Sequence, residues 1–295
     1  MSNLLKSFKI ADLAYYVKLY QAHRIAQRFR AEYEHLARDV PFHPEMGVRL
    51  DVYSPATGSG HPILIFVHGG AWSEYSKELF APVAMKLLPE KMVVVVPDHT
   101  LYPDAGYEQM AGEVAAALSW TLENIERYGG DARRVVIAGH SSGGHLVGLA
   151  VMDPRFLRVH GHTEAEVCGM ALLSGSYDIQ AQYGFERAKD GSSLAETILG
   201  VMGGEGRFSA ASPVSYARPD LPPTLILHGG EDQTIPVSIA SDFHAALQEA
   251  GGRSELKVYP GRGHSEMLFA ALVEERAQIV ADISDFVHGL SPVSL

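Results

Sequence analysis

The sequence predicts an α/β fold, with a mostly parallel central sheet and helices on both of its faces. Two observations lead to this prediction. Short, continuous apolar runs of the kind that a strand buried on both faces requires recur along the chain, and segments with helical periodicity lie between them. The expected strands are residues 63–67, 92–98, 135–138, 170–174, 224–228 and 256–259. In such sheets functional side chains gather at the carboxyl ends of the strands, so the residues directly after each run are the first candidates for a site.

The composition excludes several classes of protein. Of the 295 residues 46% are hydrophobic and 20% are charged, which is typical of a folded globular chain. A net charge of −11 argues against nucleic acid or an anionic membrane surface as a partner. Cys168 is the only cysteine, which excludes an internal disulfide and a cysteine metal cluster. We expect a soluble, cytoplasmic protein, since neither a secretory signal nor a run of 18 apolar residues is visible.

The remaining elements follow from periodicity. Apolar and aromatic residues at helical spacing predict one or two amphipathic helices over residues 10–38. Alternation of apolar and polar residues predicts a half-buried strand over residues 47–53. Further helices are expected at residues 78–88, 108–128, 144–152, 237–249 and 274–286.

One long segment, residues 177–211, interrupts the alternation of strands and helices. A long insertion above the carboxyl ends of a sheet is most often a lid or a substrate pocket. We therefore expect residues 1–45 to form N-terminal helices that contribute to a small helical cap together with this insertion. Residues 46–295 are expected to form the main domain.

Residues 139–143 read Gly-His-Ser-Ser-Gly, between an apolar, β-branched run and a helical segment. In this strand, turn and helix context the pattern G-x-S-x-G is a nucleophile elbow, and Ser141 is the candidate nucleophile. Glycines are needed two residues before and after the serine because side chains there would collide with neighbouring backbone. The following helix directs free N–H groups to the space above Ser141, where a developing oxyanion would be stabilised.

A serine hydroxyl is a weak nucleophile that needs a general base, and the base needs a carboxylate to orient it. Asp232 and His264 follow Ser141 in the order serine, acid, histidine, and both lie on loops just past expected strands. The alternatives are that Asp232 only stabilises its turn, that Glu231 is the acid, and that His264 is one surface histidine among fourteen.

His68-Gly69-Gly70-Ala71-Trp72 directly follows the expected strand 63–67. A pair of glycines after a buried strand allows the backbone to approach an oxyanion closely. We assign an oxyanion hole to the N–H groups of Gly70 and Ala71, with Ser142 as a third donor and Gly69 as the bend. The alternative is a tight turn without chemistry.

A substrate pocket is expected near these segments, lined by aromatic and histidine side chains. Its candidate residues are Trp72, Tyr75, Tyr102, His145 and Tyr177. Trp72 and Tyr75 could equally be packing aromatics. His145, one turn into the helix after the elbow, is more favoured as a packed, hydrogen-bonded core or pocket residue than as the base.

Four motifs together carry a resemblance to a known family. They are His68-Gly69-Gly70-Ala71-Trp72, residues 139–145, residues 228–236 and Gly263-His264. In these the chain resembles the α/β-hydrolase carboxylesterases of the hormone-sensitive-lipase and arylformamidase neighbourhood, and within it the isoprenylcysteine methylesterase-like carboxylesterases. The likeness covers about residue 53 to the C-terminus. It implies a capped α/β-hydrolase fold, a small-molecule ester substrate, an acyl-enzyme intermediate and no cofactor.

The chain also departs from these relatives. Lipase relatives usually have a third glycine where Ala71 and Trp72 stand, which places this chain on the formamidase and methylesterase side. The eukaryotic methylesterases are membrane-anchored, and since no anchor is visible here, the resemblance does not imply a prenylated substrate.

The leading hypothesis is a serine carboxylesterase that hydrolyses small to medium esters. An arylformamidase-type amidase would use the same triad, and Tyr183 could add to the aromatic pocket of such an enzyme. A non-catalytic binding protein would be marked by a missing triad residue, and none is missing. A metal site is the weakest idea, since His160 and His162 are the only close histidine pair and no acidic or cysteine partner completes it. A homodimer through an exposed edge strand or the last helix is left open.

Overall fold

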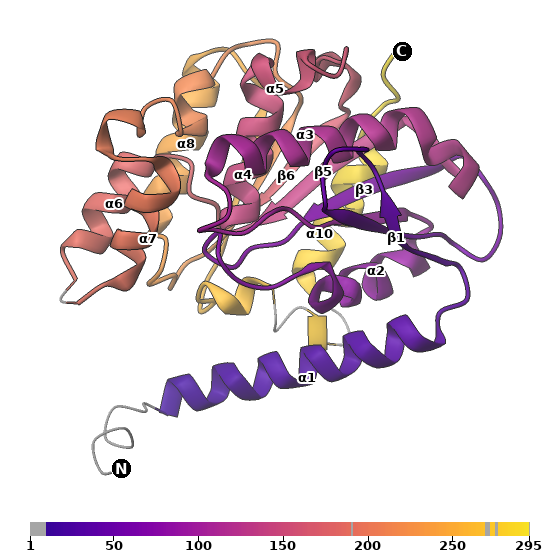
Figure 1. The fold of residues 1–295 in the computed structure, drawn as a ribbon, viewed down its shortest axis with the longest axis horizontal. Helices are drawn as coiled ribbons and strands as arrows, with labels where there is room; N and C mark the ends of the chain where they lie inside the picture. Colours follow the sequence, from indigo (N-terminus) through magenta and orange to yellow (C-terminus); the bar gives the residue numbers. More distant parts are fainter. Residues whose placement is uncertain (1–9, 190, 269–271, 275–276, 295) are drawn as a thin grey trace.

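An eight-stranded sheet organises the part of the chain that the structure describes. The structure is a computed structural model and describes residues 10–189, 191–268, 272–274 and 277–294. The strands lie in the order β1-β2-β4-β3-β5-β6-β7-β8 (Figure 1). Their bounds are β1 (Leu36–Pro41), β2 (Arg49–Tyr53), β3 (His61–Val67), β4 (Val93–Pro97), β5 (Gly130–His140), β6 (Gly169–Leu173), β7 (Thr224–Gly229) and β8 (Ser254–Tyr259).

The sheet is mostly parallel, as predicted. Every neighbouring pair from β4 across to β8 is parallel, whereas β2 is antiparallel to β4 and β1 is antiparallel to β2. All residues of β4, β6 and β7 are buried, because helices cover both faces of the sheet. The carboxyl ends of β3, β5, β7 and β8 therefore meet at one edge of the sheet.

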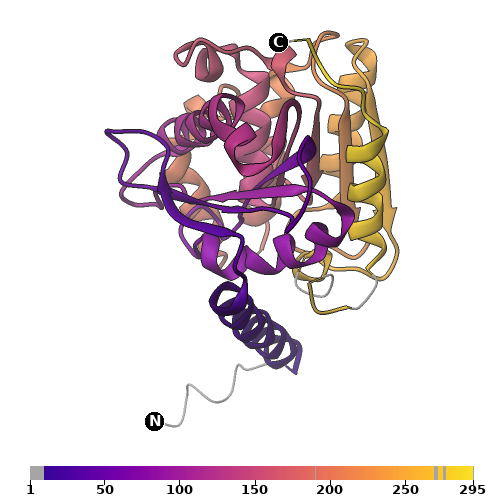
Figure 2. The same ribbon diagram turned by 90° about the vertical axis from the view of Figure 1, so that its right-hand side faces the viewer.

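Helices cover the two faces of the sheet (Figures 1 and 2). The α-helices are α1 (Ile10–Glu32), α2 (Ala81–Leu87), α3 (Tyr107–Asn124), α4 (Ser142–Met152), α5 (Pro154–Arg158), α6 (Ile179–Arg187), α7 (Ser193–Met202), α8 (Val237–Glu249) and α10 (Gln278–Gly289). Short 3₁₀ helices are η1 (Lys77–Phe80), η2 (Leu88–Glu90), η3 (Ile125–Tyr128), η4 (Glu164–Glu166), η5 (Glu205–Arg207), η6 (Pro213–Tyr216) and η7 (Ser265–Met267). Among the described helices none combines the length and the apolar character that a membrane crossing needs.

Alternate side chains of strands β3 to β7 enter two separate hydrophobic cores. Ile63 and Ile65 of β3 pack in one core with residues of α3, α4 and α8. Leu64 and Phe66 pack in the other core with residues of α2 and α10. This period of two is the pattern that continuous apolar runs satisfy when both faces of a strand are buried.

The N-terminal part differs from the prediction of helices over residues 10–38. α1 ends at Glu32, and residues Leu36–Pro41 form the edge strand β1. The pairing of β1 with β2 shifts between Ala37 and Val40, and Asp39 adopts a left-handed φ of 52°. This irregularity removes the clean alternation by which an edge strand would be recognised.

The insertion at residues 177–211 folds into α6, α7 and η5, and α6 packs against α7 (Figure 1). α1 packs instead against α2 and η1 and lies apart from α6 and α7 in both views. A cap built jointly from residues 1–45 and 177–211 stays a prediction. The predicted helix at 274–286 lies partly outside the described residues, and α10 begins at Gln278.

A buried ion network holds the segment that follows the loop at residues 68–76. Asp51 is fully buried and pairs with Arg30 of α1, with 2.9 Å between Oδ2 and Nη2. Lys77 Nζ lies 3.3 Å from Asp98 Oδ2, and the Lys77 N–H donates to Asp98 Oδ1 at 2.6 Å. Since Asp98 directly follows β4, these bonds fix the far end of the loop to the sheet.

Candidate active site

Ser141 stands at the sharp turn between β5 and α4, with φ 56° and ψ −123°. A Cβ at Gly139 would lie 2.5 Å from the carbonyl carbon and oxygen of Gly143. A Cβ at Gly143 would lie 2.2 Å from the carbonyl oxygen of Val67. The predicted collisions on both sides of the serine are therefore confirmed, and only glycine allows this turn to form.

Replacing Gly143 by alanine is expected to lower the free energy of unfolding by about 2–4 kcal/mol, because β3 or the elbow must shift to admit the methyl group. Gly112 provides the matched control. It lies within α3, and a Cβ there would meet nothing within 4 Å. Gly112→Ala is expected to raise the free energy of unfolding by about 0.5–1 kcal/mol, since alanine favours a helix over glycine. Urea unfolding of both variants measures the difference, and equal effects of the two would contradict this account of the elbow.

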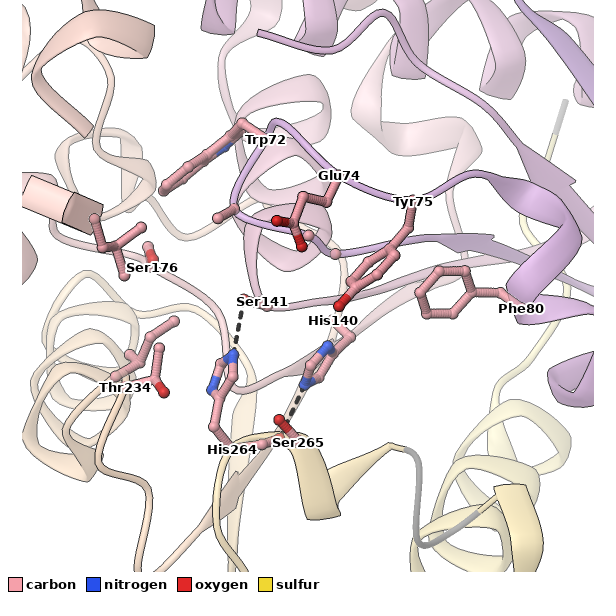
Figure 3. Close-up of a pocket in the computed structure, with 15 residues that line it drawn as sticks. Trp72, Glu74, Tyr75, Phe80, His140, Ser141, Ser176, Thr234, His264 and Ser265 are labelled. Atoms are coloured by element: carbon pink, nitrogen blue, oxygen red, sulfur yellow. Dashed lines mark hydrogen bonds between the residues drawn. The ribbon is translucent and has the colours of Figure 1, made fainter. Parts of the chain in front are cut away.

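Three predicted side chains meet at the carboxyl edge of the sheet, and Figure 3 shows two of them, Ser141 and His264. The Nε2 atom of His264, on the loop after β8, lies 2.8 Å from the Oγ atom of Ser141. Its Nδ1 atom lies 2.8 Å from Oδ2 of Asp232, on the loop after β7. The structure thus joins Ser141, His264 and Asp232 in one chain of hydrogen bonds.

Asp232 also holds its own turn. Its Oδ1 atom accepts hydrogen bonds from the N–H groups of Thr234 at 2.9 Å and Ile235 at 2.8 Å. Oδ1 of Asp232 thus stabilises the turn, as the alternative interpretation proposes, while Oδ2 contacts His264. Glu231 is exposed, and its backbone N–H donates to the Arg262 carbonyl. Within the described residues, no hydrogen bond joins the Glu231 side chain to His264.

The surroundings favour a charged Asp232. Burial opposes this charge, but the hydrogen bonds from His264 and from the Ile235 N–H hold the pKa of Asp232 below its usual value. The carboxylate therefore stays ionised and can stabilise a positive charge on His264.

His140 supports the loop of His264. Its Nε2–H donates to the backbone carbonyl of His264 across 3.2 Å, and the two rings lie 4.9 Å apart. Burial, together with repulsion from His264, lowers the pKa of His140 to about 3. The ring is thus neutral at physiological pH and adds no positive charge beside His264.

The loop after β3 lies directly on the elbow. A Cβ at Gly69 would lie 2.7 Å from the carbonyl oxygen of His140 and 3.0 Å from Cβ of Ser141. Gly70 has φ 128° and Ala71 has φ 49°, both in the left-handed range. This close approach requires glycine at position 69 and brings the loop backbone to the candidate nucleophile.

The predicted oxyanion donors are backbone N–H groups of the loop after β3 and of the first residue of α4. Within the described residues, the N–H groups of Gly70 and Ala71 donate to no backbone carbonyl. Ser142 is the first residue of α4, where a backbone N–H has no partner inside the helix. Gly69, Gly70 and Ala71 all line the cavity above Ser141.

This cavity has a volume of about 170 Å³. One wall is mainly apolar or aromatic, and the floor carries Ser141 and His264 (Figure 3). The lining residues are Gly69, Gly70, Ala71, Trp72, Glu74, Tyr75, Phe80, His140, Ser141, Ser176, Leu194, Thr234, Ile235, His264 and Ser265.

Of the five predicted pocket residues, Trp72 and Tyr75 line the cavity. The prediction is wrong in placing His145 in the lining of the pocket, whereas the interpretation of His145 as a packed, hydrogen-bonded core residue is confirmed, because the residue is fully buried. Its Nδ1 accepts a hydrogen bond from Trp72 Nε1 at 3.1 Å, and its Nε2–H donates to the Ala211 carbonyl at 2.7 Å. His145 therefore orients the indole of Trp72, and burial lowers its pKa to about 4.

The prediction is also wrong for Tyr102 and Tyr177, which do not line the cavity. Tyr177 is fully buried, stacks on Phe243 at 4.5 Å between ring centroids, and accepts a hydrogen bond from the Gly175 N–H. Tyr102 packs against Gly200 of α7, where a Cβ would lie 2.4 Å from the Tyr102 hydroxyl oxygen. Both tyrosines hold helices in place. Tyr183, considered for an aromatic pocket, packs against Phe208.

Several lining residues were not predicted. Most of them lie shortly after the end of a strand, and this position is a signal for residues that line a cavity at the carboxyl edge of the sheet. They are Ser176 after β6, Thr234 and Ile235 after β7, and Ser265 after β8. Leu194 comes from the insertion at residues 177–211, which thus reaches the cavity. Glu74 lies between the predicted residues Trp72 and Tyr75 on the loop after β3, so it carried the same signal, whereas Phe80 carried none.

The histidine pair at residues 160–162 is remote from this site. His162 lies 2.8 Å from Glu166 and 3.3 Å from Glu123 through its two ring nitrogens. His160 packs edge-on against His43. Among the described residues no group of three histidine, cysteine, aspartate or glutamate side chains is arranged to hold a metal ion.

The chain is similar to known proteins over most of its length. The BD-FAE family profile matches residues 50–247. An isoprenylcysteine alpha-carbonyl methylesterase of Arabidopsis thaliana is 27% identical over 254 residues, which are 81% of this chain and 59% of that protein. Esterase LipQ of Mycobacterium tuberculosis is 30% identical over 264 residues, which are 85% of this chain and 62% of that protein. The chain thus spans about three-fifths of the length of these two relatives.

Solved structures share the fold. A hyperthermophilic esterase from Pyrobaculum calidifontis superposes with a TM-score of 0.75 at 19% identity, covering 94% of this chain and 92% of that chain. A truncated carbohydrate esterase from gut microbiota superposes with a TM-score of 0.74 at 22% identity, covering 87% of this chain and 96% of that chain. The predicted α/β-hydrolase fold is confirmed.

Proposed function

This chain belongs to the BD-FAE family, and from that premise we propose that it is a serine carboxylesterase that hydrolyses small carboxylic esters through an acyl-enzyme. The hydrogen-bond chain from Ser141 through His264 to Asp232, at the floor of the cavity, is the observation that carries the proposal. Its order and its distances fit nucleophilic acyl transfer.

In the first half of the reaction, Ser141 Oγ attacks the ester carbonyl carbon while His264 Nε2 takes the hydroxyl proton. The carbonyl oxygen becomes an oxyanion, for which the N–H groups of Gly70, Ala71 and Ser142 are the proposed donors. Collapse of the tetrahedral intermediate breaks the bond to the alcohol oxygen, which receives the proton from His264. The acyl group then remains on Ser141.

In the second half, His264 takes a proton from a water molecule, which attacks the acyl carbon. The second tetrahedral intermediate collapses, Ser141 Oγ regains its proton from His264, and the carboxylic acid leaves. Asp232 keeps the Nδ1–H of His264 directed toward itself and stabilises the imidazolium in both halves.

The size of the cavity supports short acyl groups. Its volume is about 170 Å³, and a cavity of about 150 Å³ accommodates a ring of six carbons. We expect kcat/KM for p-nitrophenyl esters to be highest between acetate and hexanoate and to fall by about tenfold or more at laurate. A steady-state series across these chain lengths measures the optimum. An optimum at laurate would contradict the assignment of this cavity as the acyl site.

The acyl-enzyme has its own test. Rapid mixing with p-nitrophenyl acetate is expected to release a burst of p-nitrophenol equal to the enzyme concentration when deacylation is the slower half. Mass spectrometry of the quenched protein should then locate one added acetyl group on Ser141. An acetyl group on another residue would refute the assigned nucleophile. Turnover of N-formylkynurenine without turnover of any ester would refute the esterase in favour of a formamidase.

A further inference from the structure

Glu74 is the one carboxylate among the described residues that line the cavity. Glu74 is an exposed residue, so its carboxylate lies at the mouth of the cavity. No arginine or lysine lines the cavity within the described residues. The other ionisable groups of the lining are His140 and His264, which belong to the elbow and the hydrogen-bond chain, and the phenol of Tyr75.

The backbone of Glu74 is fixed relative to the proposed oxyanion donors. Its N–H donates to the Gly70 carbonyl at 2.9 Å, which closes a tight turn. Its own carbonyl oxygen would lie 2.2 Å from a Cβ at position 70, so the two residues are in close contact. The carboxylate is therefore attached to the same rigid loop that approaches Ser141.

The side chain of Glu74 lies between two aromatic rings. Figure 3 shows its carboxylate between Trp72 and Tyr75, on the side that faces Ser141. The indole of Trp72 is buried and held by its hydrogen bond to His145. A carboxylate flanked by aromatic rings attracts a cation by charge and by the negative faces of the rings.

We propose that Glu74 determines charge specificity at this site, so that esters carrying a positive charge are preferred over neutral ones and neutral ones over esters carrying a negative charge. The inference rests on the proposed esterase function and deepens it by naming the substrate class. Quaternary ammonium esters are the favoured chemistry, because they combine positive charge with an apolar surface that aromatic rings accept.

Three thioacetates of similar shape test the inference. They are acetylthiocholine, its neutral isostere with a quaternary carbon in place of nitrogen, and the S-acetyl derivative of 3-mercaptopropionate. A thiol reagent measures kcat/KM for each. For the native chain we expect the order cationic, neutral, anionic. In Glu74→Gln the ratio of cationic to neutral should fall about fivefold, and the ratio of anionic to neutral should rise about fivefold.

Glu126→Gln is the matched control. Glu126 is exposed on η3 and does not line the cavity, and its substitution changes the net charge by the same amount as Glu74→Gln. Its ratios should match those of the native chain. The native preference should also shrink in 0.5 M NaCl, since salt screens an exposed charge. Unchanged ratios in Glu74→Gln, with all three substrates still hydrolysed, would overturn this inference alone. Failure of the native chain to hydrolyse any of the three would overturn the esterase proposal and this inference with it.

Discussion

Ser141→Ala is expected to lower kcat for p-nitrophenyl butyrate by about 10⁶-fold, the size of loss that removal of a catalytic serine produces. The alanine variant has no atom that can form the acyl-enzyme, so His264 and the backbone donors would act only on a water molecule. The residual rate should be the small one that binding and oxyanion stabilisation alone provide.

The fold of this variant should be unchanged. Alanine takes the same backbone conformation with one atom fewer, so circular dichroism and thermal unfolding should match those of the native chain. Ser241→Ala, a change of the same chemistry on the exposed side of α8, is expected to retain full activity. If Ser141→Ala hydrolyses esters at a tenth of the native rate or more, another nucleophile is at work.

Asp232→Asn is expected to lower kcat by about 10⁴-fold. The amide can still accept the N–H groups of Thr234 and Ile235 through its oxygen, so the turn should persist. The amide NH₂, however, would face His264 Nδ1 and hold the ring in the wrong tautomer, with no negative charge beside the imidazolium. Glu231→Gln, which alters the adjacent exposed carboxyl, should change kcat less than twofold. A larger loss in Glu231→Gln than in Asp232→Asn would make Glu231 the acid.

The free energy of unfolding of Asp232→Asn should depend on pH differently from that of the native chain. Because the pKa of Asp232 is lowered on folding, its charge contributes stability that is present above the unfolded value of about 3.9 and is lost as pH falls through the lower folded value. Asparagine cannot contribute in this way. Urea unfolding at pH 6 and pH 3 should therefore show a larger acid loss of stability in the native chain than in Asp232→Asn. An equal loss in both would mean that Asp232 is not charged in the folded state.

The elements that sequence reasoning located well are those whose signal is local. The apolar runs of β3 and β4 and the glycines around Ser141 are each recognisable within a few residues. Since β5, β7 and β8 run parallel in one sheet, their carboxyl ends lie at the same edge. The proximity of Ser141, Asp232 and His264 follows from that topology.

The lining of the cavity depends on contacts between distant segments, which local patterns do not specify. His145 was expected in the pocket because it lies near Ser141, yet its ring bonds Ala211, a residue of the insertion. The Tyr177 ring likewise contacts a distant segment, since it stacks on Phe243 of α8, and its hydroxyl accepts the Gly175 N–H. β1 was missed because it is an exposed edge strand with an irregular register, so few of its residues are selected for apolar character.

The left-handed backbone around the cavity has a consequence for adaptation to heat. Ala71, Trp72, Tyr75 and Ser141 hold φ values of 49°, 60°, 73° and 56°, and each such conformation disfavours folding by about 1–3 kcal/mol. The packing of the sheet and its two cores must therefore stabilise backbone conformations that are unfavourable for these residues in isolation. Under selection for thermostability without selection for turnover, we expect the first substitutions to remove the unfavourable φ values of the loop after β3, for instance by placing glycine at position 71. Lineages that keep both properties should instead accumulate their stabilising changes in the helices and the sheet, far from Ser141.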